Sequence, residues 1–159
     1  MDPFSGSTTA LPPTDYAGLV AIGWLETGHT YSQGEVSEEF YRRLLELLKH
    51  PWMPCALLGM HGCDLCPFQE VEMEGEMFRD TRGSPSGNLN LFIPGRGCIY
   101  AAPELIKHYI PDHKYAPPEE FCQAVLDCPA MNSDDYFEAM KRNTPRNNRT
   151  WNAAFRHRI

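Results

Sequence analysis

Apolar residues recur at helical spacing in residues 37–50, and this is the clearest periodic pattern in the chain. They fall on one face of a helix, and they are Phe40, Leu44, Leu47 and Leu48. Ser37 stands where a capping residue is expected, and the two residues after it are glutamates, which the positive end of a helix favours. Pro51 cannot continue the helix. The pattern therefore predicts a helix from Ser37 to about His50.

Several short apolar runs bounded by turn residues predict strands. Residues 16–26 read YAGLVAIGWLE, and this run predicts a buried central strand. Residues 55–60 predict another strand, which leads into a pair of cysteines. Residues 89–93 and 98–101 flank the turn sequence PGRG and predict a hairpin. Together these runs indicate a small, mostly antiparallel sheet.

Acidic residues alternate with apolar or small residues in residues 70–77, which read EVEMEGEM. The alternation predicts a strand with all its glutamates on one face, namely Glu70, Glu72, Glu74 and Glu76. That face is too polar for a core. It suits either a solvated edge strand, whose charges discourage aggregation, or a docking surface for a basic protein.

Prolines and a capping serine mark three further helices. Pro103 suits the first turn of a short helix over residues 104–109, which Pro111 is expected to end. Another helix follows the proline pair at 117–118, and a last one follows Ser133, which precedes two aspartates. The predicted fold class is therefore α+β, with a small, mostly antiparallel sheet and three to four helices.

The chain has 159 residues and an ordinary globular composition, which fits one domain. We expect residues 1–15, which are rich in Ser, Thr and Pro, to be a disordered leader. Residues 16–143 are expected to form the domain, and residues 144–159 a basic tail. Neither a secretory signal nor an apolar run of membrane-spanning length is readable, so we expect a cytoplasmic protein without membrane contact.

Charge is unevenly distributed along the chain. The net charge is −7, yet residues 144–159 hold four arginines and no acidic residue. An acidic body does not suit binding to phosphate groups, so no nucleic acid is expected as a partner. The charge distribution instead favours a basic protein.

Two cysteines and two histidines have the spacing of metal ligands. Cys63 and Cys66 lie two residues apart in HGCDLCP, and His108 and His113 lie in HYIPDH. Thiolate and imidazole are the ligands of tetrahedral structural zinc, and both spacings fall within the ranges that such sites use. The long segment between the two pairs excludes the compact DNA-reading finger. The sequence thus predicts a Zn²⁺ knuckle that staples a loop to the end of a helix.

Two neighbouring residues belong to the same hypothesis. His61 is either an alternative ligand or a supporting residue, and Glu104, one helical turn before His108, is expected to orient the imidazole of His108. With four protein ligands the site is closed, which favours a structural role, and the common hydrolase, deaminase and phosphate-binding motifs are absent. A small zinc-dependent hydrolase with His61 or Glu104 as base remains the alternative, provided that one ligand position is open to water.

The segments GMHGCDLC, NLFIPG, YAAPELIKHYIPDHKYAPPEEF and QAVLDCP resemble a family of small uncharacterised bacterial proteins. This family is a domain of unknown function with the motifs G-x-H-x-C-x-x-C and HY-x-x-x-H, and the resemblance covers residues 16–140. It implies metal binding and no particular activity. From the charge distribution and the absence of catalytic motifs, we expect a non-enzymatic, zinc-stabilised protein-binding module of the immunity or adaptor kind.

Overall fold

The computed structural model describes residues 18–54, 60–80 and 83–144. Three strands form its central sheet: β1 (Leu19–Ala21), β6 (Asn90–Pro94) and β7 (Ile99–Pro103). The strand order is β1-β7-β6, with β7 antiparallel to β6 and parallel to β1. The predicted hairpin around PGRG is thus confirmed. The predicted strand at 55–60 and the leader and tail lie wholly or mainly outside the described residues.

Strand β1 is an edge strand, so the prediction of a central strand in residues 16–26 is wrong. It is only three residues long, and Val20 at its middle is 39% exposed. Glycines with positive φ at 18 and 23 flank it, which limits its length. The central position belongs to β7. It pairs with β6 across a short local turn on one side and with β1 on the other.

Three helices begin where the serines and prolines before them predict. Helix α1 spans Glu38–Leu47, α3 spans Glu119–Asp127 and α4 spans Asp134–Asn143. The side chains of Ser37 and Ser133 accept hydrogen bonds from backbone N–H groups in the first turns of α1 and α4. Helix α1 ends three residues before the predicted His50.

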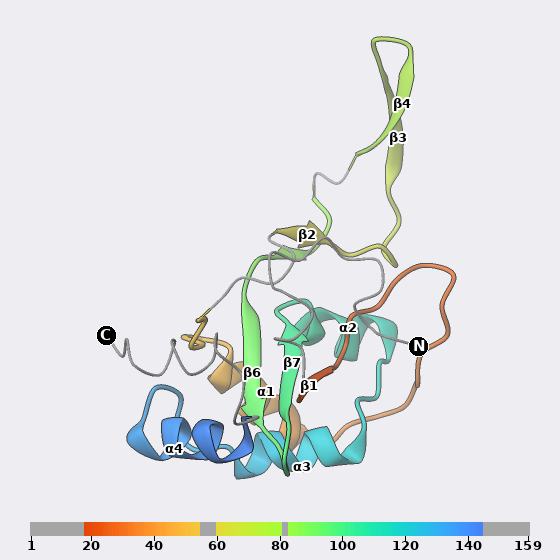
Figure 1. The fold of residues 1–159 in the computed structure, drawn as a ribbon. Coiled ribbons are helices and arrows are strands. Elements are labelled where there is room, and N and C mark those ends of the chain that lie inside the picture. Colours follow the sequence, from red (N-terminus) through yellow and green to blue (C-terminus); the bar gives the residue numbers. More distant parts are fainter. Residues whose placement is uncertain (1–17, 55–59, 81–82, 145–159) are drawn as a thin grey trace.

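These helices enclose one core with the sheet (Figure 1). Helix α1 packs on α3 and on α2 (Ile106–His113), and α3 and α4 contact β6. Buried aromatic rings join the layers, because Phe121 contacts both Phe40 and Tyr100 edge to face. The Tyr136 hydroxyl donates a 2.8 Å hydrogen bond to the carbonyl of Phe92 in β6. The predicted α+β class is therefore confirmed. No helix in the described ranges is long and apolar enough to span a bilayer.

Helix α2 (Ile106–His113) contains Pro111, so the prediction that this proline ends the helix is wrong. Proline has no N–H group and cannot bond to the carbonyl four residues earlier, which belongs to Lys107. The Tyr41 hydroxyl of α1 donates a 2.8 Å hydrogen bond to that carbonyl instead. The helix therefore continues to His113 with its missing bond replaced from a neighbouring helix.

Between α1 and β6 the chain extends away from the central sheet and the helices, which form the body of the molecule. We call this segment the excursion. It contains β2 (His61–Gly62), β3 (Gln69–Met73), β4 (Glu76–Asp80) and β5 (Ser86–Gly87). Strands β2 and β5 form a short antiparallel ladder, and β3 and β4 form a hairpin that projects from the molecule (Figure 1).

The glutamates of residues 70–77 do not share one face, contrary to the sequence prediction. The chain reverses at Glu74 and Gly75, which both have positive φ, as a two-residue type I′ turn requires. Glu76 therefore pairs with Met73, on the face opposite Glu70 and Glu72. The alternation of glutamates in the sequence thus continues through the turn, but the turn places Glu76 on the other face of the hairpin.

Candidate metal centre

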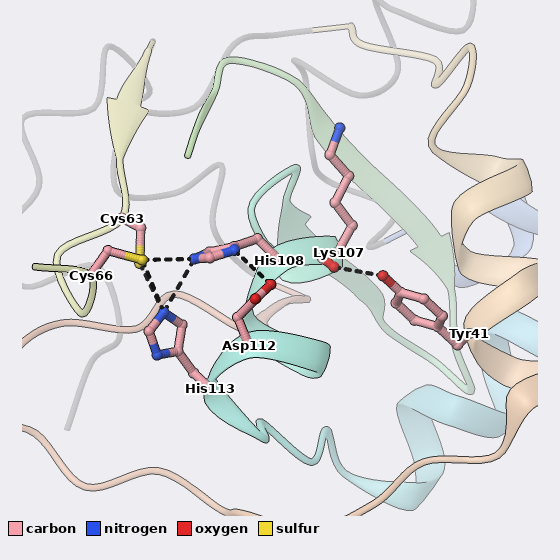
Figure 2. A network of polar contacts seen from close by, with 7 residues as sticks. All are labelled: Tyr41, Cys63, Cys66, Lys107, His108, Asp112 and His113. Atoms are coloured by element: carbon pink, nitrogen blue, oxygen red, sulfur yellow. Dashed lines mark hydrogen bonds and ion pairs between the residues drawn. The ribbon is translucent and has the colours of Figure 1, made fainter. Parts of the chain in front are cut away.

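Two cysteines and two histidines meet beside the end of α2 (Figure 2). One possible ligand atom from each of Cys63, Cys66, His108 and His113 lies within 4.8 Å of all the others. His108 Nε2 is 3.2 Å from Cys66 Sγ and 3.1 Å from His113 Nε2, and His113 Nε2 is 3.3 Å from Cys63 Sγ. The residues that the spacing singled out are thus brought together.

The spacing of the donor atoms suits a single tetrahedral ion. With bonds of about 2.3 Å to sulfur and about 2.0–2.1 Å to nitrogen, tetrahedral zinc separates its ligand atoms by roughly 3.3–3.8 Å. The sulfur-to-nitrogen separations of 3.2–3.4 Å lie close to that range. Two thiolates and two imidazoles are also a donor set typical of zinc. The cluster could therefore hold a metal ion with little movement.

The cysteines come from the turn that follows β2. Strand β2 pairs with β5, and beyond the ladder the Cys63 N–H donates a 2.8 Å hydrogen bond to the carbonyl of Pro85. The Thr27 hydroxyl donates a 2.8 Å hydrogen bond to the carbonyl of Asp64, inside the C-x2-C turn. Cys63 is 1% exposed. Hydrogen bonds between the backbone of this turn and two other segments therefore fix the turn that carries both sulfur atoms.

The histidines converge because the end of α2 is wider than a regular helix. At 3.6 residues per turn, side chains five residues apart point about 140° away from each other. Here Lys114 N–H bonds to the carbonyl of Tyr109, five residues earlier, and Tyr115 N–H bonds to the same carbonyl. A turn closed by such bonds holds more residues than an α-helical turn. It therefore brings the ring of His113 toward that of His108.

Asp112 orients the ring of His108, a role that the sequence analysis assigned to Glu104. His108 Nδ1 lies 3.0 Å from Asp112 Oδ2, and this contact leaves Nε2 directed at the sulfur of Cys66 (Figure 2). A carboxylate on the second nitrogen of a ligating histidine fixes its tautomer and raises its basicity. Asp112 follows His108 by four residues, so helical periodicity would have found it had Pro111 not been read as the helix end.

Glu104 supports the cysteine side of the cluster. Its side-chain oxygens accept hydrogen bonds from the N–H groups of Asn88 and Leu89, at 3.2 and 3.4 Å, and from Lys107 Nζ at 2.7 Å. Burial alone would raise the pKa of Glu104, but these hydrogen bonds lower it below its ordinary value. Glu104 thus anchors the chain just after β5, whose partner β2 leads into Cys63.

Gly87 makes that anchor possible. A Cβ atom at this position would lie 2.7 Å from Glu104 Oε2 and 2.9 Å from Glu104 Cβ. Contacts of that length between nonbonded carbon and side-chain atoms are repulsive. The close approach of β5 to the turn that precedes α2 therefore requires glycine at position 87.

The surroundings of the cluster favour neutral imidazole at His113. Burial is the main cause that lowers the pKa of His113, and the neighbouring His108 lowers it further, while Asp112 opposes the shift. Neutral imidazole is the form that binds metals. Tyr109 closes the inner side with a buried ring, and burial, together with the nearby sulfur of Cys63, raises the pKa of its hydroxyl.

The remaining candidate residues lie elsewhere or outside the described side chains. His61 lies in β2 through its backbone, but its side chain is not among those described. Cys128 is buried, whereas Cys98 and Cys122 are half-buried, and Cys55 lies outside the described residues. Burial raises the pKa of the Cys128 thiol to about 12. Among the described cysteines, Cys98, Cys122 and Cys128 are not members of the cluster.

The model of a protein family matches residues 4–126 of the chain, which include every residue of the cluster. Neither the curated proteins nor the solved structures give a match to this chain. On this evidence the chain belongs to the family described as Domain of unknown function (DUF7919).

Proposed function

We propose that this protein is a non-enzymatic protein-binding module, of the adaptor or immunity kind, whose fold is held together by one structural zinc ion. The observation that carries the proposal is the convergence of four protein donors, from Cys63, Cys66, His108 and His113, within 4.8 Å. Four such donors complete a tetrahedral shell and leave no position for a water nucleophile. A closed shell is the arrangement of structural zinc.

The position of the cluster explains what the ion would stabilise. The cysteines belong to the excursion that carries β2 to β5, and the histidines belong to α2 in the body. Structural zinc contributes an apparent binding free energy on the order of 10 kcal/mol at neutral pH, comparable to the stability of a small domain. The ion would therefore fasten the excursion to the body and hold the hairpin in a fixed direction.

Protein binding is the role that the charge distribution supports. Residues 69–80, which make up the projecting hairpin, contain five acidic residues and one arginine. The partner that fits this charge is a basic protein, because charge complementarity accelerates association and excludes acidic partners. The alternative of a hydrolase has less support, because the carboxylate of Glu104 is bound to Lys107 and to backbone N–H groups.

Metal analysis tests the first half of the proposal. Protein purified without chelators should contain about one zinc ion per chain, as a closed site requires. The double variant Cys63→Ser, Cys66→Ser should lose the ion and much of its thermal stability. The matched control is Cys98→Ser, Cys122→Ser, which removes two thiols outside the cluster and should keep the zinc. Wild-type protein without metal would refute the zinc proposal.

Affinity capture tests the second half. The zinc-loaded chain should retain a basic protein from a lysate of its source at low salt and release it at high salt. The variant Glu70→Gln, Glu72→Gln keeps the size of both side chains and removes two charges from the hairpin. It should retain less of that protein, and equal retention by both chains would count against the acidic surface.

A further inference from the structure

The hairpin β3–β4 has two chemically different faces. Directly paired residues of antiparallel strands share a face, so Val71 and Phe78 lie together, next to Met73 and Glu76. On the other face, Glu70 lies opposite Arg79, and Glu72 lies opposite Met77. One face is therefore mainly apolar near its middle, and along β3 the other face presents Glu70 and Glu72.

The apolar face is accessible to solvent. Met73 is 59% exposed and Phe78 is 46% exposed, and Val71 between them is half-buried. Among the described residues, the main packing partner of each strand of the hairpin is the other strand. The hairpin projects away from the body, so the helices do not cover it (Figure 1). An exposed apolar cluster rimmed by charge is typical of a contact surface.

Hairpin energetics also point to a ligand. An isolated two-stranded hairpin is marginally stable in water, and further strands usually stabilise it. Each strand here has an outer edge to which another strand can add by backbone hydrogen bonds. A strand added to either of these edges would direct its successive side chains alternately to the two faces of the hairpin.

We propose that the hairpin binds an extended segment of a partner protein in which apolar and basic residues alternate. The apolar side chains of that segment lie beside Val71, Met73 and Phe78, and its basic side chains lie beside Glu70 and Glu72. The period of two in the ligand matches the two faces of the hairpin. A second copy of the chain is a poor ligand, because residues 69–80 of both copies are acidic. This inference rests on the proposed role in protein binding and specifies how the partner is recognised.

Peptide binding to the zinc-loaded full chain tests this inference. The probe is a soluble ten-residue peptide of alternating lysine and valine, and its binding is measured by fluorescence anisotropy at low salt. Two reference peptides replace valine by serine, which keeps the charge, or lysine by glutamate, which keeps the apolar residues. The lysine–valine peptide should bind at least about tenfold more tightly than either reference peptide.

Substitutions on the two faces identify the contact surface. The variant Met73→Ser, Phe78→Ser should weaken binding of the lysine–valine peptide by about tenfold or more, because both side chains face the ligand. Met77→Ser is the matched control, since Met77 is 61% exposed on the opposite face, and it should change the affinity by less than about twofold. Zinc content and circular dichroism should remain unchanged in both variants.

The outcomes separate this inference from the proposed function. Equal binding of the lysine–serine peptide, or no binding of the lysine–valine peptide, would overturn the inference. The acidic surface would still stand if Glu70→Gln, Glu72→Gln reduced capture of the basic protein. Sedimentation that revealed a dimer, lost in Met73→Ser, Phe78→Ser, would assign the apolar face to a second copy and would also overturn the inference.

Discussion

Replacement of Tyr41 by phenylalanine tests how α2 accommodates Pro111. The substitution removes only the hydroxyl that donates a 2.8 Å hydrogen bond to the carbonyl of Lys107. A lost hydrogen bond costs about 0.5–1.5 kcal/mol, and a partly buried carbonyl left without its donor raises the cost toward about 1–3 kcal/mol. We therefore expect Tyr41→Phe to lower the free energy of unfolding by about 1–2 kcal/mol.

The test of this explanation is a double-mutant cycle with Pro111→Ala. Alanine restores an N–H group that can bond to the Lys107 carbonyl within the helix, so the hydroxyl of Tyr41 becomes less important. In the alanine background, Tyr41→Phe should cost about 0.5 kcal/mol or less, which gives a coupling energy of about 1 kcal/mol. Urea denaturation of the zinc-loaded protein at pH 7 measures all four free energies.

Tyr31→Phe provides the matched control. The Tyr31 hydroxyl donates a 3.2 Å hydrogen bond to the carbonyl of His113, which no N–H group at position 111 can replace. Its cost should therefore be the same with proline or alanine at position 111. If Tyr41→Phe also costs the same in both backgrounds, the hydroxyl does not substitute for the missing helical bond, and the explanation is wrong.

Three further substitutions test the support of the metal centre. Asp112→Asn should weaken zinc binding about 10–100-fold, measured by competition with a chelator, because it removes the charge beside His108 Nδ1; an unchanged affinity would assign Asp112 no role. Gly87→Ala should lower the melting temperature by about 2–8 °C, whereas Gly62→Ala, whose Cβ meets nothing closer than 3.7 Å, should change it by less than about 2 °C. Glu104→Gln should destabilise the protein at pH 7 but less in acid. The lowered pKa of Glu104 contributes stability at pH values above the ordinary pKa of 4.5, and this stability is lost as the pH falls through the pKa of the folded state. Denaturant melts between pH 3 and 7 that show a constant difference between the variant and the wild type would contradict this.

Local signals account for the parts of the fold that the sequence predicted. The caps at Ser37 and Ser133 and the turn between β6 and β7 depend on neighbours a few residues away, so short patterns were sufficient to locate them. The metal cluster was also predictable, because thiolate and imidazole at two short spacings have few other common explanations. Its prediction required no information beyond residue type and position.

Nonlocal contacts account for the errors. The hydroxyl that allows Pro111 to remain within α2 lies on Tyr41, 66 positions before the Lys107 carbonyl that it binds, and no local pattern indicates it. The edge position of β1 likewise depends on a parallel pairing with β7, far along the chain. The reversal at Glu74 and Gly75 is a different case, because a glycine was present as a turn signal but the regular alternation around it favoured one continuous strand.

The five-residue spacing of the histidines makes the metal centre dependent on a segment that supplies no ligand. A regular helix would direct His108 and His113 apart, so their convergence requires the wide end of α2, which Lys114 closes in the left-handed conformation with φ of 55°. This conformation is unfavourable for a residue with a side chain. Residues 31–34 hold it in place, because Gly34 N–H bonds to the carbonyl of Lys114 and the Tyr31 hydroxyl bonds to that of His113. The segment before α1 is therefore part of the metal centre in a structural sense, although only the two short motifs carry the donor atoms.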